Sequence, residues 1–91
     1  MSQAAARPYE TLRVEHRNGV GWLTLNRPDR FNALNGQMID ELLRYFDTLL
    51  FDHVVRVVVL RGAGKHFCAG MDLTEADSFT ASNPSSLRAQ R

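Results

Sequence analysis

The residues most able to do chemistry gather in one stretch of the chain, residues 61–77. This stretch holds three glycines, a lysine, a histidine and the chain's single cysteine, followed by three acidic residues. Such a mixture could cradle a phosphate, ligate a metal, form a nucleophile and base pair, or transfer protons. Each of these chemistries needs particular residues at particular spacings, so each can be compared with the sequence.

A phosphate-binding loop is the first candidate, because the glycine-rich residues 61–66 follow an apolar run. A Walker A loop ending at Lys65 would need glycine where Val59 stands and serine or threonine where His66 stands. A dinucleotide fingerprint would need a small residue where Phe67 stands. We therefore interpret the segment as a glycine turn that leaves a strand.

His66 and Cys68 could serve as metal ligands or as a nucleophile and its base. We expect the His66 and Cys68 side chains to point to opposite faces and therefore not to form a nucleophile and base pair. His16 and His53 are distant in the sequence and no second ligand pair accompanies them, so we expect no structural metal site. Cys68 is interpreted as a small packing residue.

The acidic residues Asp72, Glu75 and Asp77 could suggest paired carboxylate chemistry. Acidic residues are also favoured at the start of a helix by the positive end of its dipole. We favour this plainer explanation for the cluster.

Length and composition restrict the class of protein. The 91 residues are 44% hydrophobic and 23% charged, with a net charge of +1 that is too near balance to favour a nucleic-acid-coating surface. One cysteine forms no intramolecular disulfide, which fits a reducing compartment. The sequence has no signal-peptide pattern and no window with the ~20 apolar residues of a membrane span. We expect a cytoplasmic protein without nucleic-acid or membrane partners.

The first elements form a predicted β-hairpin. Residues 11–17 alternate between apolar and polar side chains, as in a half-buried strand. Asn18-Gly19 readily takes the positive φ angles of a type I′ turn, and residues 20–26 then supply a second strand. Pro28 ends it, because proline has no N–H to donate to a sheet.

An amphipathic helix is predicted over residues 36–50, with Asn35 as its N-cap. The predicted core-facing side chains are apolar: Met38, Ile39, Leu42, Leu43, Tyr45, Phe46, Leu49 and Leu50. The predicted solvent-facing side chains are polar: Gln37, Asp40, Glu41, Arg44, Asp47 and Thr48.

Residues 54–60 are mostly β-branched and nearly unbroken in apolar character. This pattern fits a strand covered on both faces, as in a parallel sheet flanked by helices. Such a strand needs more covering surface than one helix and a hairpin provide. Residues 67–69 are interpreted as a short strand or turn, and residues 70–77 as the start of a second helix.

Two segments in this order resemble the enoyl-CoA hydratase and isomerase family, the crotonase superfamily. They are Leu-Asn-Arg-Pro-Asp-Arg-Phe-Asn-Ala-Leu-Asn at 25–35 and Arg-Val-Val-Val-Leu-Arg-Gly-Ala-Gly-Lys-His-Phe-Cys-Ala-Gly-Met-Asp-Leu at 56–73. The resemblance runs from about residue 11 to residue 75. It implies an α/β fold, the amino-terminal part of a crotonase-like spiral of ββα units. The expected divisions are a flexible arm over 1–8, a partial domain over 9–77 and a mobile loop or truncated continuation over 78–91.

The resemblance also implies a chemistry. Proton removal beside a thioester, or addition of water to its conjugated double bond, places negative charge on the thioester oxygen, and stabilising that charge needs donors fixed in advance. By similarity, the backbone N–H of Met71 is one oxyanion-hole donor, and Asp72 holds the turn rather than transferring protons. The residues expected at the substrate and CoA site are Arg30, Phe31, Ala33, Ala69, Gly70, Met71, Asp72 and Leu73. Arg27 and Lys65 are further candidates for phosphate contact.

The expected parent protein is an acyl-CoA enzyme that hydrates an enoyl-CoA or isomerises its double bond, as a homotrimer or homohexamer. It needs no cofactor beyond the coenzyme A of its substrate. In this family a second oxyanion donor and the acid/base residues come from a later part of the chain, so these 91 residues alone are expected to be inactive. The alternatives are a naturally short, non-catalytic CoA-binding module and a structural subunit completed by another chain.

Overall fold

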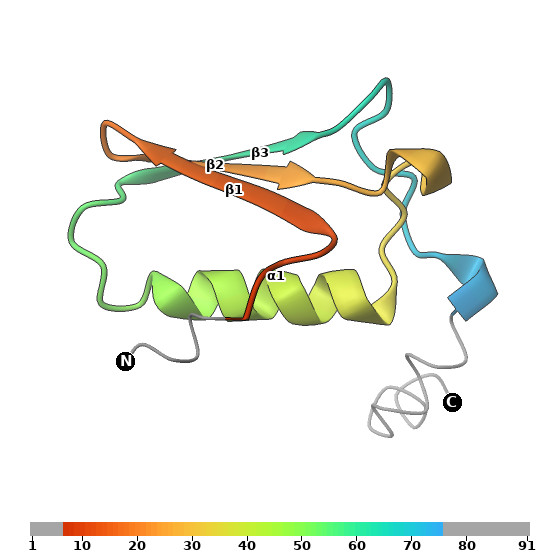
Figure 1. Cartoon of the computed structure of the whole chain (residues 1–91), viewed down its shortest axis with the longest axis horizontal. Coiled ribbons are helices and arrows are strands. Elements are labelled where there is room, and N and C mark those ends of the chain that lie inside the picture. The colour runs from red at the N-terminus through yellow and green to blue at the C-terminus, as the bar shows by residue number, and fades with distance from the viewer. Residues whose placement is uncertain (1–6, 76–91) are drawn as a thin grey trace.

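The computed structural model describes residues 7–75. In chain order the elements are β1 (Leu12–Arg17), β2 (Val20–Leu25), a 3-10 turn η2 (Pro28–Arg30), α1 (Gly36–Thr48), β3 (Val57–Gly62) and a 3-10 turn η3 (Leu73–Glu75). The three strands form one sheet in the order β1-β2-β3, and α1 runs along one side of it (Figure 1). The α/β architecture is as predicted.

The hairpin of β1 and β2 is confirmed. The two strands pair antiparallel from Leu12 opposite Leu25 to Arg17 opposite Val20. Asn18 and Gly19 join them with φ angles of 51° and 80°, as a type I′ turn requires. β3 then pairs with β2 in parallel, so the carboxyl ends of β2 and β3 lie at the same end of the sheet.

The helix begins where its cap was predicted. The Asn35 side-chain oxygen accepts a hydrogen bond from the N–H of Met38 at 2.9 Å, which satisfies a donor that has no partner within the helix. Met38 and Tyr45 pack with Leu23 and neighbouring leucines of β1 and β2 in the core between the helix and the hairpin.

The predicted division of the helix into two faces is wrong in part. Glu41, expected to face solvent, is buried, whereas Leu43, Phe46 and Leu50, expected to face the core, are 64%, 46% and 71% exposed. Met38, Glu41 and Tyr45 are the buried residues of the helix, and Leu42 and Leu49 pack partly buried against the same core, as predicted. Glu41 is buried there because its carboxylate accepts hydrogen bonds from polar groups of the chain that precedes β1.

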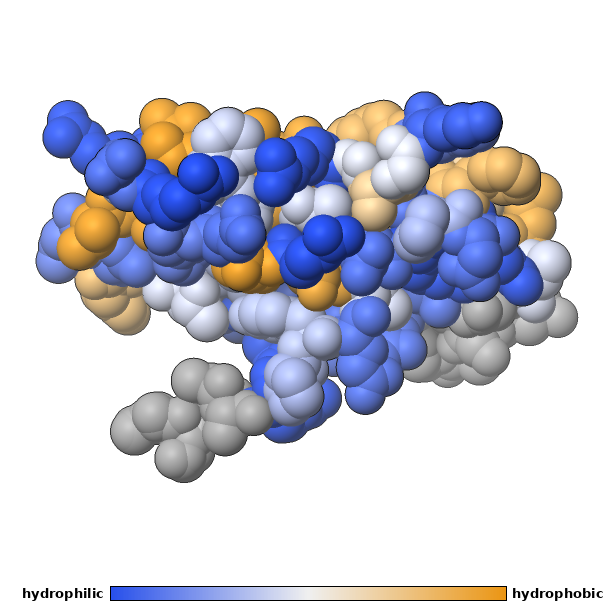
Figure 2. All heavy atoms as spheres, turned by 45° about the horizontal axis from the view of Figure 1, so that its top comes forward, coloured by the Kyte–Doolittle hydropathy of each residue, from blue (hydrophilic) through white to orange (hydrophobic). Residues whose placement is uncertain are grey.

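β3 begins at Val57 rather than at the predicted residue 54. The prediction that both of its faces are covered is wrong for the described residues, since Val57 and Leu60 are 54% and 45% exposed. The reason is geometric. The helix α1 packs against one face of the sheet beneath β1 and β2, and residues 7–75 contain no second layer of structure to cover β3. On the face shown in Figure 2, hydrophobic residues are interrupted by hydrophilic ones.

On the side of the sheet away from α1, arginines cover the aromatic ring of β2. The guanidinium carbons of Arg17 and Arg61 lie 5.4 and 4.9 Å from the centre of the Trp22 ring, within the range of cation–π attraction. Arg61 also donates through Nε to the hydroxyl of Thr24 at 2.9 Å. Charged side chains thereby shield apolar surface on this face.

Of the second helix predicted over residues 70–77, the described chain contains only the single turn η3. Residues 76–91 and residues 1–6 lie outside the described part, so the predicted amino-terminal arm and the carboxyl-terminal loop remain predictions. Among residues 7–75, the helices are too short or too polar to span a bilayer.

Candidate functional site

Two loops meet at the end of the sheet where β2 and β3 both finish. The first is residues 26–34 and the second is residues 63–72. The buried Asn32 joins them, because its side-chain amide donates to the carbonyl oxygen of Ala63 at 2.9 Å and to that of His66 at 2.8 Å. The parallel pairing of β2 and β3 therefore places both segments of the sequence motif side by side.

The backbone around Asn32 adopts a conformation that few residues accept. Phe31 and Asn32 have φ angles of 56° and 57°, in the left-handed region that asparagine tolerates better than most residues. The Asn32 side-chain oxygen also accepts the N–H of Arg27 at 2.8 Å. Sequence reasoning missed Asn32, although an asparagine in the loop after a parallel strand was a usable signal.

The second loop returns to the first through backbone hydrogen bonds. The N–H of Ala69 donates to the carbonyl oxygen of Phe31 at 3.0 Å. Leu34 then donates to the oxygen of Gly70 at 2.7 Å and accepts from the N–H of Asp72 at 2.8 Å. These bonds make the turn at residues 69–72 a fixed part of the structure.

Met71 stands opposite Leu34 in an isolated parallel bridge. In this bridge Leu34 uses both of its backbone groups and Met71 uses neither. The N–H of Gly70 is directed at the Cys68 sulfur, 3.4 Å away. Within residues 7–75, the N–H of Met71 makes no hydrogen bond, so it is the one unused amide between Ala69 and Asp72.

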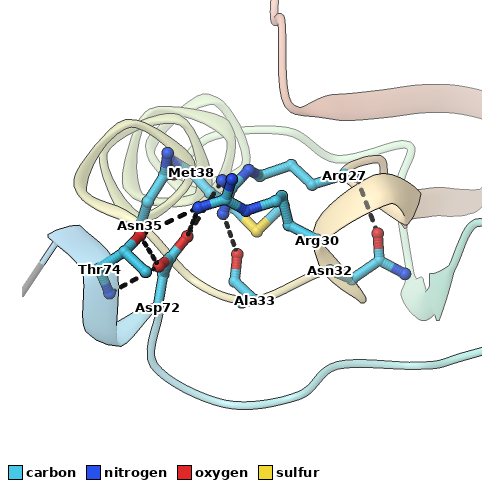
Figure 3. A network of polar contacts seen from close by, with 8 residues as sticks. All are labelled: Arg27, Arg30, Asn32, Ala33, Asn35, Met38, Asp72 and Thr74. Atoms are coloured by element: carbon cyan, nitrogen blue, oxygen red, sulfur yellow. Dashed lines mark hydrogen bonds and ion pairs between the residues drawn. The ribbon is translucent and has the colours of Figure 1, made fainter.

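An ion pair holds the last residue of the turn, Asp72. The Arg27 guanidinium donates to the Asp72 carboxylate at 3.1 Å, and the two side chains are 12% and 4% exposed. Arg27 also donates to the carbonyl oxygen of Ala33. Figure 3 shows the Arg30 guanidinium and Thr74 approaching the same carboxylate, with Arg30 3.8 Å from an Asp72 oxygen.

The carboxyl of Asp72 is held in its ionised form. Hydrogen bonds from Thr74, through its hydroxyl at 2.6 Å and its N–H at 3.0 Å, and the contact with Arg27 keep the pKa of Asp72 below its ordinary value. Burial acts in the opposite direction and is outweighed. Thr74 was not singled out from the sequence. Arg27, a further candidate for phosphate contact, donates to Asp72 and Ala33.

A cavity of about 490 Å³ opens beside the turn. Seven of the eight residues predicted for the substrate site line it, all except Gly70, together with Asp29 and Thr74. Arg30 is the cation of this lining; most of the other lining residues named from the sequence are apolar. Lys65, the other predicted phosphate contact, is exposed.

A second cavity of about 310 Å³ is lined by Phe31, His66, Cys68 and Ala69. The Phe31 and His66 rings meet edge to face with centroids 5.0 Å apart. The expectation that His66 and Cys68 point to opposite faces is wrong. Residues two apart on an extended segment share a face, and both side chains line this cavity. No cluster of three or more metal-ligating side chains occurs among residues 7–75.

The comparison with protein families agrees with this geometry. The family model described as enoyl-CoA hydratase/isomerase matches residues 15–89. The chain therefore belongs to this family, and its fold is an α/β part of the crotonase fold.

Individual relatives carry several activities in their names. The Mycobacterium tuberculosis protein named "Probable enoyl-CoA hydratase echA8" is 40% identical over 79 residues, which are 80% of this chain and 31% of that protein. An Arabidopsis thaliana 3-hydroxyisobutyryl-CoA hydrolase is 47% identical over 60 residues, covering 66% of this chain and 16% of the relative. This chain thus spans less than a third of the length of these relatives.

Solved structures give the same result. Pseudomonas aeruginosa AtuE superposes with a TM-score of 0.75 and 40% identity, covering 88% of this chain and 31% of that one. An enoyl-CoA hydratase from Mycobacterium tuberculosis gives a TM-score of 0.70 at 37% identity, covering 75% of this chain and 31% of the other.

Proposed function

We propose that this chain supplies the acyl-CoA-binding and oxyanion-stabilising part of a crotonase-type enzyme. The substrate is an enoyl-CoA, and the reaction is hydration or double-bond isomerisation through a thioester enolate. The N–H of Met71 is the donor to the thioester oxygen. Proton transfer belongs to groups outside residues 7–75.

The unused N–H of Met71 is the observation that carries this proposal. It stands between amides that are all hydrogen-bonded, on a residue that lines the larger cavity. A donor fixed before the reaction stabilises developing negative charge without reorganisation, and one such donor is typically worth ~2.7 to 4 kcal/mol in the transition state.

The cavity lining fits a CoA thioester. Phe31, Ala33 and Met71 offer apolar surface to an acyl or pantetheine chain, and Arg30 offers a cation to a phosphate. The Arg30 side chain is 46% exposed and is held by a hydrogen bond to Thr74 at 3.0 Å and an ion pair with Asp72 at 3.8 Å, so its exposed side remains open to an anion.

Asp72 is unsuited to proton transfer. Its carboxylate is buried, paired with Arg27 and bonded to Thr74, and its pKa is lowered rather than raised. A general acid or base near neutral pH needs a pKa close to that pH. Asp72 therefore holds the turn, and the choice among reactions lies elsewhere in the protein.

The names of the relatives support a shared step rather than a single reaction. They include hydratases, a CoA hydrolase and a hydroxycinnamoyl-CoA hydratase-lyase. All these names specify CoA thioesters but different reactions. We therefore assign the thioester-binding role to this chain with hydration or isomerisation as the leading reaction.

Titration of the chain with crotonyl-CoA tests the proposal. We compare the wild type with Met71→Pro, which removes the N–H, and Met71→Ala, which keeps it. Met71→Ala should bind crotonyl-CoA and shift the ¹³C resonance of a labelled thioester carbonyl as the wild type does, whereas Met71→Pro should lose the shift. An equal shift in the folded proline variant would refute the donor assignment.

Turnover provides the second measurement. We expect residues 1–91 to bind crotonyl-CoA without consuming its conjugated double bond. Hydration or isomerisation by this chain would show that its own residues transfer protons, contrary to the proposal.

A further inference from the structure

The ion pair between Arg27 and Asp72 links the loop after β2 to the residue next to Met71. We propose that this pair positions the Met71 N–H for the thioester oxygen, with Asp72 as a positioning residue rather than a catalytic one. This inference rests on the proposed function, because it assumes that Met71 is the oxyanion donor.

The direction of the Met71 N–H follows from the peptide bond before it. In a planar trans peptide the carbonyl and the N–H point in opposite directions. The carbonyl of Gly70 accepts from the N–H of Leu34 at 2.7 Å. The N–H of Met71, in the same peptide unit, therefore points away from Leu34.

Glycine makes this peptide easy to rotate unless both of its ends are held. Gly70 has a φ of 96°, and a Cβ placed there would meet no atom within 4 Å. Residue 70 has no side chain that could restrict the turn, and local crowding does not restrict it either. The restraint has to come from the groups on either side of Met71.

Asp72 restrains the far end of the turn through two parts of the residue. Its N–H donates to the carbonyl oxygen of Leu34 at 2.8 Å. Its carboxylate is bound by Arg27 at 3.1 Å and by the hydroxyl and N–H of Thr74 at 2.6 and 3.0 Å. The residue is therefore held by both backbone and side chain, immediately after the amide that must not move.

Arg27 connects this anchor to the opposite side of the bridge. The same guanidinium that meets Asp72 donates to the carbonyl of Ala33, the residue before Leu34. One cation, whose side chain is 12% exposed, thereby links the residue before Leu34 to the residue after Met71. A planar guanidinium can bond both acceptors at once, which a single ammonium cannot do with the same geometry.

The test separates a positioning role from general stability by using two ligands. Crotonyl-CoA has a thioester carbonyl and free CoA has none, so only the first can use the Met71 N–H. In Asp72→Asn we expect the dissociation constant for crotonyl-CoA to rise roughly threefold to tenfold, the range for one displaced hydrogen bond, with no change for free CoA. The downfield shift of the Met71 amide proton on saturation with crotonyl-CoA should shrink in parallel.

Two further variants complete the experiment. Asp40→Asn removes an exposed carboxylate from α1 and should behave as the wild type. Arg27→Lys keeps the charge beside Asp72 but loses the two-acceptor geometry, so it should show a smaller loss that is again selective for crotonyl-CoA. This variant also tests the inference if Asp72→Asn does not fold.

The outcomes distinguish the two proposals. Equal weakening of both ligands in the folded variants would indicate a purely structural role and overturn the positioning inference, as would unchanged binding of crotonyl-CoA. If the wild-type Met71 amide does not shift with crotonyl-CoA at all, the donor assignment itself is wrong and the inference fails with it.

Discussion

Glu41 and Thr11 are joined by two hydrogen bonds, from the backbone N–H and the side-chain hydroxyl of Thr11 to one carboxylate oxygen, both at 2.9 Å. The N–H of Glu10 reaches both carboxylate oxygens, at 3.0 and 3.1 Å, and Gln37 donates to the second at 3.1 Å. Glu41 is only 4% exposed. One carboxylate of α1 thus satisfies the donors that precede β1 and fastens the helix to the sheet.

Replacement of Glu41 by glutamine should destabilise the protein by about 1–3 kcal/mol, because the buried donors around it would face an N–H₂ group in place of an oxygen. The measurement is the free energy of unfolding in urea. Asp40→Asn, which also removes one carboxylate from α1, serves as the control and should change stability little. Equal effects of the two substitutions would contradict the role assigned to Glu41.

Acid should unfold the protein in part through the same group. Burial alone would raise the pKa of Glu41, but the hydrogen bonds from Thr11, Glu10 and Gln37 hold it below its ordinary value. A carboxyl whose pKa is lower in the folded state than in the unfolded chain binds protons more weakly when folded, so protonation favours unfolding. Its contribution is complete above about pH 4.3 and disappears as the pH falls through the lowered pKa.

The measurement is the midpoint of urea unfolding between pH 6 and pH 2. The midpoint should fall with acid, and the fall should be shallower in Glu41→Gln, which has no proton to gain. Asp72 and Asp52 also have lowered pKa values, from Thr74 and from the N–H groups of Val55 and Val54 respectively, so some acid sensitivity should persist in that variant. An identical slope in both proteins would contradict the prediction.

Features that depend on neighbouring residues were predictable from the sequence. The turn at Asn18 and Gly19 needs two positive φ angles, and the sequence places there the two residue types that accept them. Asn35 caps α1 because its side chain reaches the N–H of Met38 three residues later. In both cases the physical cause lies within four consecutive residues.

Features that depend on distant residues were not predictable in the same way. Helical periodicity assigned Glu41 to the solvent side because it carries no information about donors at residues 10 and 11. The partner of Arg27 was missed for the same reason, since Asp72 is on another loop. Parallel pairing of two strands brings together the loops that follow them. The predicted parallel sheet therefore indicated that these two loops meet, whereas the charges of the residues alone did not identify the partners.

The end of β3 passes so close to the second loop that only glycine fits at position 62. A Cβ on Gly62 would lie 2.5 Å from the carbonyl oxygen of His66 and closer still to that of Phe67. Gly62→Ala should therefore cost about 1–3 kcal/mol of stability, because backbone must shift. Gly36→Ala, where nothing lies within 4 Å, is the control and should be neutral or slightly stabilising.

Backbone movement at Gly62 should also reach the candidate site. His66 accepts a hydrogen bond from Asn32, so a displaced carbonyl at residue 66 would loosen the junction between the two loops. Amide hydrogen exchange at Ala69 and Asp72 should accelerate in Gly62→Ala and not in Gly36→Ala. Unchanged exchange, with the folded state intact, would show that the turn is held independently of β3.

Asn32 offers the sharpest test of that junction, because its backbone and side-chain roles can be separated. Asn32→Gly accepts the φ of 57° but loses the side-chain bonds to Ala63, His66 and Arg27, at about 1 kcal/mol each. Asn32→Ala loses the same bonds and adds about 1–2 kcal/mol for the left-handed backbone.

Asn32→Asp keeps an acceptor for the N–H of Arg27 but sets a second oxygen against the carbonyls of Ala63 and His66. Oxygen facing oxygen in a buried site is repulsive as well as unpaired, so this variant should be less stable than Asn32→Gly despite its closer shape. Urea unfolding of the three variants gives their order. If Asn32→Asp proved more stable than Asn32→Gly, the bond to Arg27 would outweigh the two bonds to the carbonyls. The Asn32 side chain would then stabilise mainly the first loop and not its junction with the second.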